Sequence, residues 1–488
     1  MAPAALVNPL VYSTPKQPRG FSWWRPGLLQ LVLGVLAFLV LGQVGPTDWW
    51  IPGSFLVVSG MALLPPIYWA LKRPTAVVLA DHLFVLAGAF LVYFVIGAML
   101  LPFGPYDEAE FSLAYYRINA SMAMSVAAVN FIGFGLALIA SVFAPKRVFA
   151  RIARSAVRVG DRIPLEWVIA GFLALGSYSY IYVLNFDVNP QPGAVISGSW
   201  RSLSNLLLAA VVLAAAHQGK GARFLRIVAI GMVVVQAVGG LLMLNKGQVL
   251  MPIVALCVGY IWRLGVRKVA LPGLIVILST FLIIASPVAT VRNLYGTDSK
   301  VDWDTRVSVL WDGIFKPKTD SLESDYYPWA RFCYTPPQAA AMDFYDAGRG
   351  GDDFEKAGWV FLPRFLFPQK PVITAVGQEF HYKITGMLTS ATGQGVFVNG
   401  YYNLGILGVI VSGLGVGLML ACTSSFAGVV LKKRALIWLP FALLGSYMAF
   451  RIDGFFLGDY LGPFSLLLYS LITAMLLAQF FVRSRYTI

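Results

Sequence analysis

Residues 359–415 read WVFLPRFLFPQKPVITAVGQEFHYKITGMLTSATGQGVFVNGYYNLGILGVIVSGLG. The stretch begins as an aromatic, proline-rich, basic segment and continues without a polar break into a glycine-rich apolar helix. Such a change in composition predicts a chain that leaves water and enters a lipid bilayer. The charged residues of the stretch are therefore expected at a membrane surface.

Prolines stiffen the first part of this stretch, residues 359–371, which we call the strap. Pro363, Pro368 and Pro371 each fix their own φ and hold the preceding residue in an extended conformation. Arg364 and Lys370 lie between these prolines. Because Arg offers a planar fork of donors and Lys offers a point charge, the pair suits a phosphate or pyrophosphate ligand.

The composition of the whole chain agrees with a membrane environment. Of 488 residues, 58% are hydrophobic and 12% are charged, whereas about a quarter of the residues of a soluble domain are charged. We therefore expect an all-α, polytopic membrane protein. The formal charge of +14 would also fit a nucleic-acid-binding protein. In a membrane protein, however, the positions of the charges matter more than their sum, and we expect no nucleic-acid partner.

Apolar runs of roughly 17 to 25 residues predict transmembrane helices. The chain contains twelve of them, with no internal repeat and no separate soluble domain, so residues 1–488 form a single integral membrane domain. The predicted spans are about 27–44, 50–71, 76–102, 119–143, 165–185, 202–217, 225–244, 248–263, 269–290, 404–430, 435–450 and 462–482.

The distribution of Lys and Arg predicts the orientation of these spans. Basic residues gather in the N-terminal arm, in the 145–164 loop, and in the turns near 218–226, 263–268 and 431–434. Short loops rich in Lys and Arg stay on the cytoplasmic side. Both termini are therefore predicted to be cytoplasmic.

This orientation places residues 292–395 outside as one large outer loop, which is too long for a passive connector. We expect it to contain short amphipathic helices that rest on the membrane face and fold over the bundle as a lid. Its aromatic side chains are expected at the lipid interface, where such rings are favoured. They are Phe365, Phe367, Phe380 and Tyr382.

Charged residues at membrane depth are candidates for a site, because each costs roughly 2.5–3.5 kcal/mol at a helix centre unless it has a partner or faces a cavity. Lys246 and Arg292 lie at outer span ends, where they are either interfacial anchors or contacts for an anionic substrate. Arg451 and Asp453 are expected to pair, which leaves the Arg451 side chain able to present donors to a ligand.

Two further residues are candidates for a general base. His381 is the only histidine of the outer loop, and histidine titrates near neutral pH. Glu379 lies two residues before it, and either residue is also explained as an incidental loop residue. The Asp352-Asp353 pair is expected in a solvated turn. We find no metal-binding or nucleotide-binding motif, and so expect no metal site and no cofactor.

The order of these residues resembles one family. Pro363, Arg364, Phe367, Pro368, Lys370 and Pro371, followed by Tyr401 or Tyr402, Asn403, Gly405 and Gly408, are similar to a region of the Wzy-type bacterial polysaccharide polymerases. The close match covers about 50 residues, and the plan of spans with one large late loop is also similar. Family members often have Arg-Gly after a middle span, where this chain has Lys246-Gly247.

The resemblance implies a metal-independent, inverting glycosyltransferase that polymerises repeat units into O-antigen or exopolysaccharide. It also implies a bacterial inner membrane, with residues 292–395 as a large periplasmic loop and an active site that faces the periplasm. Its substrates would be glycans linked to undecaprenyl pyrophosphate, and a chain-length regulator is a further partner. Cleavage leaves a pyrophosphate anion, for which Arg364, Lys370, Arg292, Lys246 and Arg451 are the available cations. His381, Glu379 and Asp453 are the candidate bases, and Tyr401, Tyr402 and Asn403 are candidate glycan contacts.

Two other functions remain open from the residues alone. An O-antigen ligase would also have about twelve spans and a large outer loop with basic residues. A lipid-oligosaccharide flippase or another transporter would have charges lining a path through the middle of the bundle. The sequence places most of its candidate charges near the outer rim, which favours an enzyme.

Overall fold

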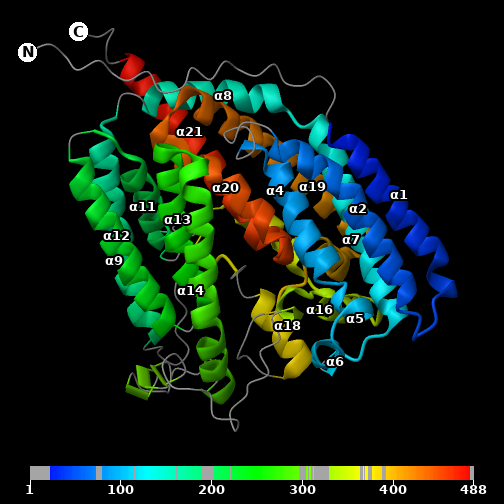
Figure 1. Cartoon of the computed structure of the whole chain (residues 1–488). Coiled ribbons are helices and arrows are strands. Elements are labelled where there is room, and N and C mark those ends of the chain that lie inside the picture. The colour runs from blue at the N-terminus through cyan, green and yellow to red at the C-terminus, as the bar shows by residue number, and fades with distance from the viewer. Residues whose placement is uncertain are drawn as a thin grey trace, which may run out of the picture.

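The computed structural model describes residues 22–72, 80–114, 116–160, 163–188, 200, 203–219, 221–243, 245–295, 304–305, 307–308, 311–312, 329–362, 366–367, 369–371, 376–386 and 392–483. These residues form helices and connecting segments, and no strand occurs among them (Figure 1). Ten of the described helices are long and apolar enough to cross a membrane. The prediction of an all-α, polytopic membrane protein is confirmed.

The predicted spans correspond to the observed helices one by one. One of them, α11, has only 11 residues and is shorter than the ten helices of membrane-spanning length. The span helices are α1 (Trp24–Val40), α2 (Trp50–Leu71), α4 (His82–Phe90) with its continuation to α5 (Leu100–Phe103), α7 (Ala120–Phe143), α9 (Leu165–Val188), α11 (Leu206–Ala216), α12 (Ala222–Leu242), α13 (Lys246–Leu264), α14 (Val266–Tyr295), α19 (Val396–Lys433), α20 (Leu439–Phe450) and α21 (Gly462–Arg483).

The helices form two packed groups (Figure 1). Helices α9, α11, α12, α13 and α14 pack on one another, and α1, α2, α4, α7 and α19 form the second group around the largest apolar core. Small residues bring α7 and α19 together: a Cβ added to Gly417 would lie 1.9 Å from the carbonyl oxygen of Ala137. Close helix packing through small residues is usual in a bilayer, where lipid gives no hydrophobic drive between helices.

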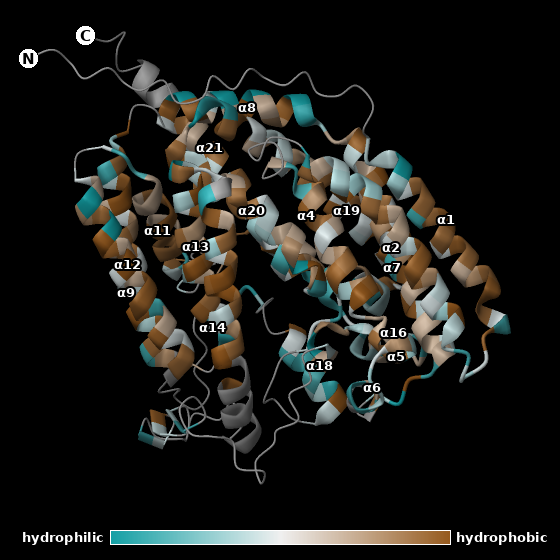
Figure 2. Ribbon diagram, in the orientation of Figure 1, coloured by the Kyte–Doolittle hydropathy of each residue, from teal (hydrophilic) through white to brown (hydrophobic). Residues whose placement is uncertain are grey.

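The amphipathic helix α8 (Lys146–Gly160) lies across one end of the bundle. It buries one apolar face, including Ala153, Ala156 and Val157, against α19 and α21, and it exposes arginines on the other face. Figure 2 shows hydrophilic residues along α8 and around α18 (Val376–Thr385), and hydrophobic residues along the helices between them. We call these two ends the α8 side and the loop side.

The predicted outer loop does contain short helices, but it does not simply lie on the membrane face. Helix α16 (Thr335–Asp346) enters the bundle, because the Gln338 side chain accepts a hydrogen bond of 3.0 Å from Asn130 Nδ2. Asn130 is ten residues from the start of α7, which places it about 15 Å along that helix. The loop is therefore partly a structural component of the bundle.

The expected placement of the loop aromatics at the lipid interface is wrong for Phe380. Its side chain is 1% exposed, and its ring packs against those of Phe344 and Tyr402 inside the protein. Tyr382, two residues along α18, is exposed as expected. Phe367 packs against Trp359 within the strap, and Phe365 lies outside the described residues.

Helix α19 is broken where the sequence predicted a single entry into the membrane. Leu404 (φ −140°, ψ 20°) and Gly405 (φ 60°, ψ −143°) are not helical. A Cβ added to Gly408 would lie 1.9 Å from the carbonyl oxygen of Gly400, although residues eight apart in a straight helix are about 12 Å apart. Residues 396–403 therefore fold back along residues 406–433 as a helical hairpin.

This hairpin requires glycine at position 405, because its φ and ψ lie in a region that other residues populate at a cost of about 1–3 kcal/mol. An added Cβ would also lie 2.8 Å from the Tyr345 hydroxyl. We predict that Gly405→Ala lowers the midpoint of thermal unfolding of the purified protein. Gly428→Ala, in the same helix with nothing within 4 Å of its Cβ, is the control and should leave the midpoint unchanged or higher. Equal effects of the two substitutions would contradict the turn.

Candidate functional site

Three inserted segments meet inside the bundle. They are the start of α16, the extended peptide 392–395, and the turn that joins α20 to α21. The backbone N–H of Gly395 donates to the carbonyl oxygen of Asp453 at 3.0 Å. The hydroxyl of Tyr334, just before α16, donates to Asp453 Oδ2 at 2.9 Å. Asp453 therefore joins two parts of the loop segment to the turn.

The turn carries an ion pair between Arg451 and Asp459. Arg451 Nε donates to Asp459 Oδ1 at 3.1 Å, and the other carboxylate oxygen accepts from the backbone N–H of Phe455 at 2.9 Å. The expected ion pair of Arg451 with Asp453 is wrong as a direct contact, because Arg451 pairs with Asp459 and the Asp453 carboxylate accepts from Tyr334. The charges of Arg451 and Asp453 still attract each other. The Arg451 side chain is 38% exposed, and its two Nη groups have no hydrogen-bond partner among the described residues.

This turn lies well inside the bundle. A Cβ added to Gly415 would lie 2.7 Å from the Phe456 ring, and Gly415 is ten residues, or about 15 Å of helix, beyond the hairpin turn at Gly405. Ionised groups at such a depth cost roughly 2.5–3.5 kcal/mol each without partners. Such charges mark a functional pathway or site more often than a structural anchor.

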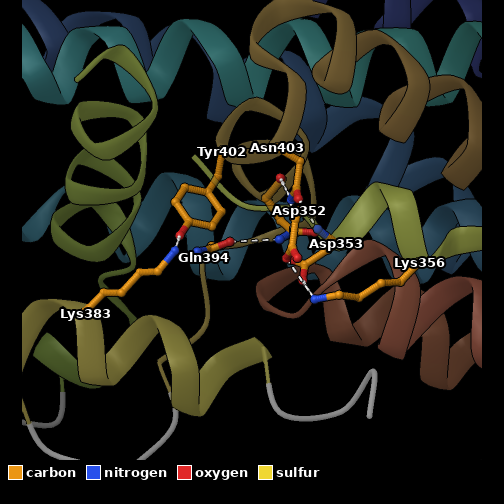
Figure 3. A network of polar contacts seen from close by, with 8 residues as sticks. Asp352, Asp353, Lys356, Lys383, Gln394, Tyr402 and Asn403 are labelled. Atoms are coloured by element: carbon orange, nitrogen blue, oxygen red, sulfur yellow. Dashed lines mark hydrogen bonds and ion pairs between the residues drawn. The ribbon is translucent and has the colours of Figure 1, made fainter. Parts of the chain in front are cut away.

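Asparagines on one face of the inserted helix connect the turn to the loop side, where Figure 3 shows Asn403 beside Asp353. Asn399 accepts from the backbone N–H of Phe456 at 3.2 Å and donates to Gln394 Oε1 at 2.8 Å. Asn403, one helical turn further, donates to the Asn399 carbonyl oxygen at 2.8 Å and accepts from the backbone N–H of Asp353 at 2.7 Å. Through these contacts the hairpin is tied both to the turn and to the loop.

The Asp352-Asp353 pair divides between solvent and interior. Asp352 is 65% exposed in its side chain, as expected for a solvated turn, and its hydrogen bond with Lys356 Nζ at 2.8 Å lowers its pKa. Asp353 is 4% exposed, and burial raises its pKa, so the expectation of a solvated turn is wrong for Asp353. Burial disfavours the Lys356 ammonium, but Asp352, Asp353 and Glu379 together outweigh it and raise the pKa of Lys356.

The two tyrosines predicted to contact a glycan have partners in the loop segment. Lys383 Nζ donates to the Tyr402 hydroxyl at 2.7 Å (Figure 3). The Tyr401 hydroxyl donates to Asp346 Oδ1 at 2.9 Å. These contacts hold α18 and the end of α16 against the hairpin, so the tyrosines position the loop around the site.

The structure separates the candidate bases. Asp453 lies beside Arg451 in the same turn. His381 and Glu379 are on α18, where His381 Nδ1 lies 2.8 Å from Thr392 Oγ1 and Glu379 is exposed. Only Asp453 among the three belongs to the charged turn inside the bundle.

Of the remaining predicted cations, Lys370 and Lys246 are described, and no contact of either with this turn is observed. Lys370 Nζ donates to the carbonyl oxygens of Leu362 at 3.0 Å and Val360 at 3.5 Å, so it closes the strap on itself. Lys246 is the first residue of α13, in the other helix group. Arg292 is near the end of α14, and its side chain lies outside the described residues, as does the whole of Arg364.

Sequence reasoning missed several members of this network, among them Tyr334, Gln394, Asn399 and Asp459. One signal was present: Asn399 and Asn403 are four residues apart in an apolar stretch, a spacing that places two amides on one face of a helix. Tyr334 and Asp459 carried no such signal, because their contacts depend on how α16 and the α20–α21 turn are inserted.

The chain matches no protein-family model, no curated protein and no solved structure. The family likeness therefore rests on the residues of the sequence alone.

Asn399 is predicted to be essential for joining the turn to the hairpin. Asn399→Ala would leave the buried Phe456 N–H and Gln394 Oε1 without partners, at a cost of roughly 1–3 kcal/mol for each group. We expect a clearly lower midpoint of thermal unfolding in detergent. The control is Ser412→Ala, also in α19, because the buried Ser412 hydroxyl has no hydrogen-bond partner in the described structure. An Asn399→Ala protein as stable as Ser412→Ala would contradict the connection.

Proposed function

We propose that the chain is a membrane glycosyltransferase that polymerises glycan repeat units linked to undecaprenyl pyrophosphate. The observation that carries this proposal is the partly exposed Arg451 guanidinium, which Asp459 holds beside Asp453 inside an apolar bundle. The start of α16 and the peptide 392–395 border the same site and connect it to the loop side. A lipid-linked glycan needs such a place, because its pyrophosphate stays near lipid while its sugars extend into water.

In the proposed reaction, the acceptor hydroxyl attacks C1 of the sugar attached to the donor pyrophosphate. The bond between C1 and the pyrophosphate oxygen breaks, and the oxygen keeps the electron pair. The Nη groups of Arg451 would meet this developing charge, and fixed donors of this kind often supply the greater part of an enzyme's rate enhancement. The Asp453 carboxylate would take the hydroxyl proton, while Tyr334 orients it through Oδ2.

In this proposal the residues predicted from the sequence take different roles. Asp453 replaces His381 and Glu379 as the preferred base, because it alone lies in the turn with Arg451. Arg364 stays a predicted second pyrophosphate ligand, since it belongs to the same loop segment that supplies Tyr334. Lys370 is assigned to holding the strap closed. The reaction site would face the periplasm, with both termini cytoplasmic.

One observation favours a second candidate, a transporter of lipid-linked oligosaccharides. Helix α16 and residues 396–403 begin inside the bundle rather than at its surface. Many transporters build their substrate sites from such discontinuous helices near the middle of the membrane. The same charged turn would then be a binding site on a path rather than a reaction site.

Deleting the gene and analysing the lipid-linked glycans tests the proposal. Loss of a polymerase leaves single repeat units on the carrier, at the periplasmic face. Loss of a ligase leaves long chains on the carrier, and loss of a flippase leaves single units at the cytoplasmic face. Labelling of intact spheroplasts with a lectin separates the two faces. Single units that the lectin reaches support the polymerase, and either of the other patterns overturns it.

Substitutions in the turn give a sharper test with purified protein and lipid-linked repeat units in excess chelator. We predict that Arg451→Ala slows polymerisation about a hundredfold or more and that Arg451→Lys restores only part of the rate, because Lys lacks the fork. Asp453→Asn should cost about 10²–10⁴-fold as the loss of a general base. Rates within about twofold of wild type for Asp453→Asn would contradict the assignment.

The controls remove charges of the same type from exposed surfaces outside the turn. The control variants are Arg158→Ala, at an exposed position of α8, and Asp107→Asn, at an exposed position of α6 (Tyr106–Ala114). Both should insert normally and polymerise at the wild-type rate.

A further inference from the structure

A cavity of about 590 Å³ lies at the α8 side of the other helix group, far from the charged turn along the chain. It is bounded by the turn between α11 and α12 and by the end of α13. The packing of α11 against Leu436, and of Trp438 against α8, places this turn at the α8 end of the bundle. Its lining includes Gly219, Gly221, Arg223, Arg226, Arg263 and Leu264.

Three guanidinium groups from two helices line this cavity. Arg223 and Arg226 are on the first turns of α12, and Arg263 is on the last turn of α13. None of the three forms an ion pair within the part of the chain that the structure describes. Arg263 lies 5.8 Å from the centre of the Tyr260 ring. The cavity therefore concentrates positive charge that the described protein does not neutralise.

One carboxylate, that of Glu166, lies near the rim. Glu166 Oε1 lies 3.4 Å from Nε2 of the buried His217, whose ring borders Gly219. This places Glu166 beside the cavity wall, while its carboxylate faces the histidine rather than the arginines.

The position of Arg223 and Arg226 on α12 strengthens the case for an anionic ligand. Cations are unfavourable near a helix N-terminus, where the helix dipole is positive. Helix α12 has no acidic residue in its first turn, and its N-cap, Gly221, offers no side chain to accept a hydrogen bond. An anion in the cavity would offset the arginine charges and the helix dipole together.

We propose that this cavity binds a phosphate group, as carried by the headgroup of an anionic phospholipid. The paired N–H donors of arginine match the geometry of phosphate oxygens. Basic pockets between the ends of transmembrane helices bind anionic lipid headgroups. Each arginine is followed by an apolar residue with an exposed side chain, on which acyl chains can lie. These residues are Phe224, Ile227 and Leu264.

The test compares two triple variants of the full-length protein in detergent. One is Arg223→Ala/Arg226→Ala/Arg263→Ala in the cavity, and the other is Arg147→Ala/Arg151→Ala/Arg154→Ala on the exposed face of α8. Both remove three positive charges from the same side. The probes are phosphatidylglycerol, phosphatidylcholine and inorganic phosphate, with binding followed by native mass spectrometry and by the shift of the thermal unfolding midpoint.

We expect phosphatidylglycerol to bind and stabilise the wild type, and phosphatidylcholine to do neither. The cavity variant should bind phosphatidylglycerol about a hundredfold more weakly, or about fivefold for each arginine, while the α8 variant loses much less. Stabilisation by phosphatidylglycerol alone identifies a lipid headgroup as the ligand, and equal stabilisation by inorganic phosphate identifies a soluble phosphate. Similar losses in the two triple variants, or no loss in either, would overturn the proposal. Arg226→Lys keeps the positive charge and is the control for a folding defect. It should retain most of the binding.

Discussion

The ion pair between Arg451 and Asp459 is the constraint on which the inner part of this molecule depends. A guanidinium and a carboxylate about 15 Å inside an apolar bundle need partners from the protein, because lipid supplies none. Asp459 takes its second contact from the Phe455 backbone, and the adjoining N–H of Phe456 is taken by Asn399. The backbone N–H of Phe456 in the α20–α21 turn therefore has its hydrogen bond only when the hairpin of α19 lies beside the turn.

The same requirement explains why the loop segment enters the bundle. Irregular backbone at membrane depth is tolerated where it is buried in protein, and the peptide 392–395 meets this condition by donating from Gly395 to Asp453. Tyr334 supplies the other contact to Asp453 from the start of α16. The loop segment, the hairpin and the charged turn therefore stabilise one another, because each has a polar group whose hydrogen-bond partner lies in another of the three. The network built in this way reaches the loop side through Asn403 and Asp353.

Much of the fold could be predicted from the sequence, because the length of an apolar run is set by the thickness of a bilayer. The span predicted at 404–430 begins at the Leu404-Gly405 break, so its start was located correctly. The preceding residues 396–403 were not recognised as a helix inside the bundle. Gly400 would fit equally well in a flexible loop, and the contact of Gly400 with Gly408 appears only in the folded chain. Of the site, Arg451 and Asp453 were predicted from their charge at depth, whereas their true partners, Asp459 and Tyr334, depend on three-dimensional insertion that no local pattern records.

A double-mutant cycle on Tyr334 and Asp453 tests most directly whether the charged turn is the reaction site. The measured quantity is the rate at which purified Tyr334→Phe, Asp453→Asn and the double variant polymerise lipid-linked repeat units. If Tyr334 acts by orienting the Asp453 carboxylate, the double variant should be no slower than Asp453→Asn alone, because effects of residues that act as a unit are not additive. Losses that multiply in the double variant, or a Tyr334→Phe protein and an Asp453→Asn protein that both polymerise at the wild-type rate, would contradict the account.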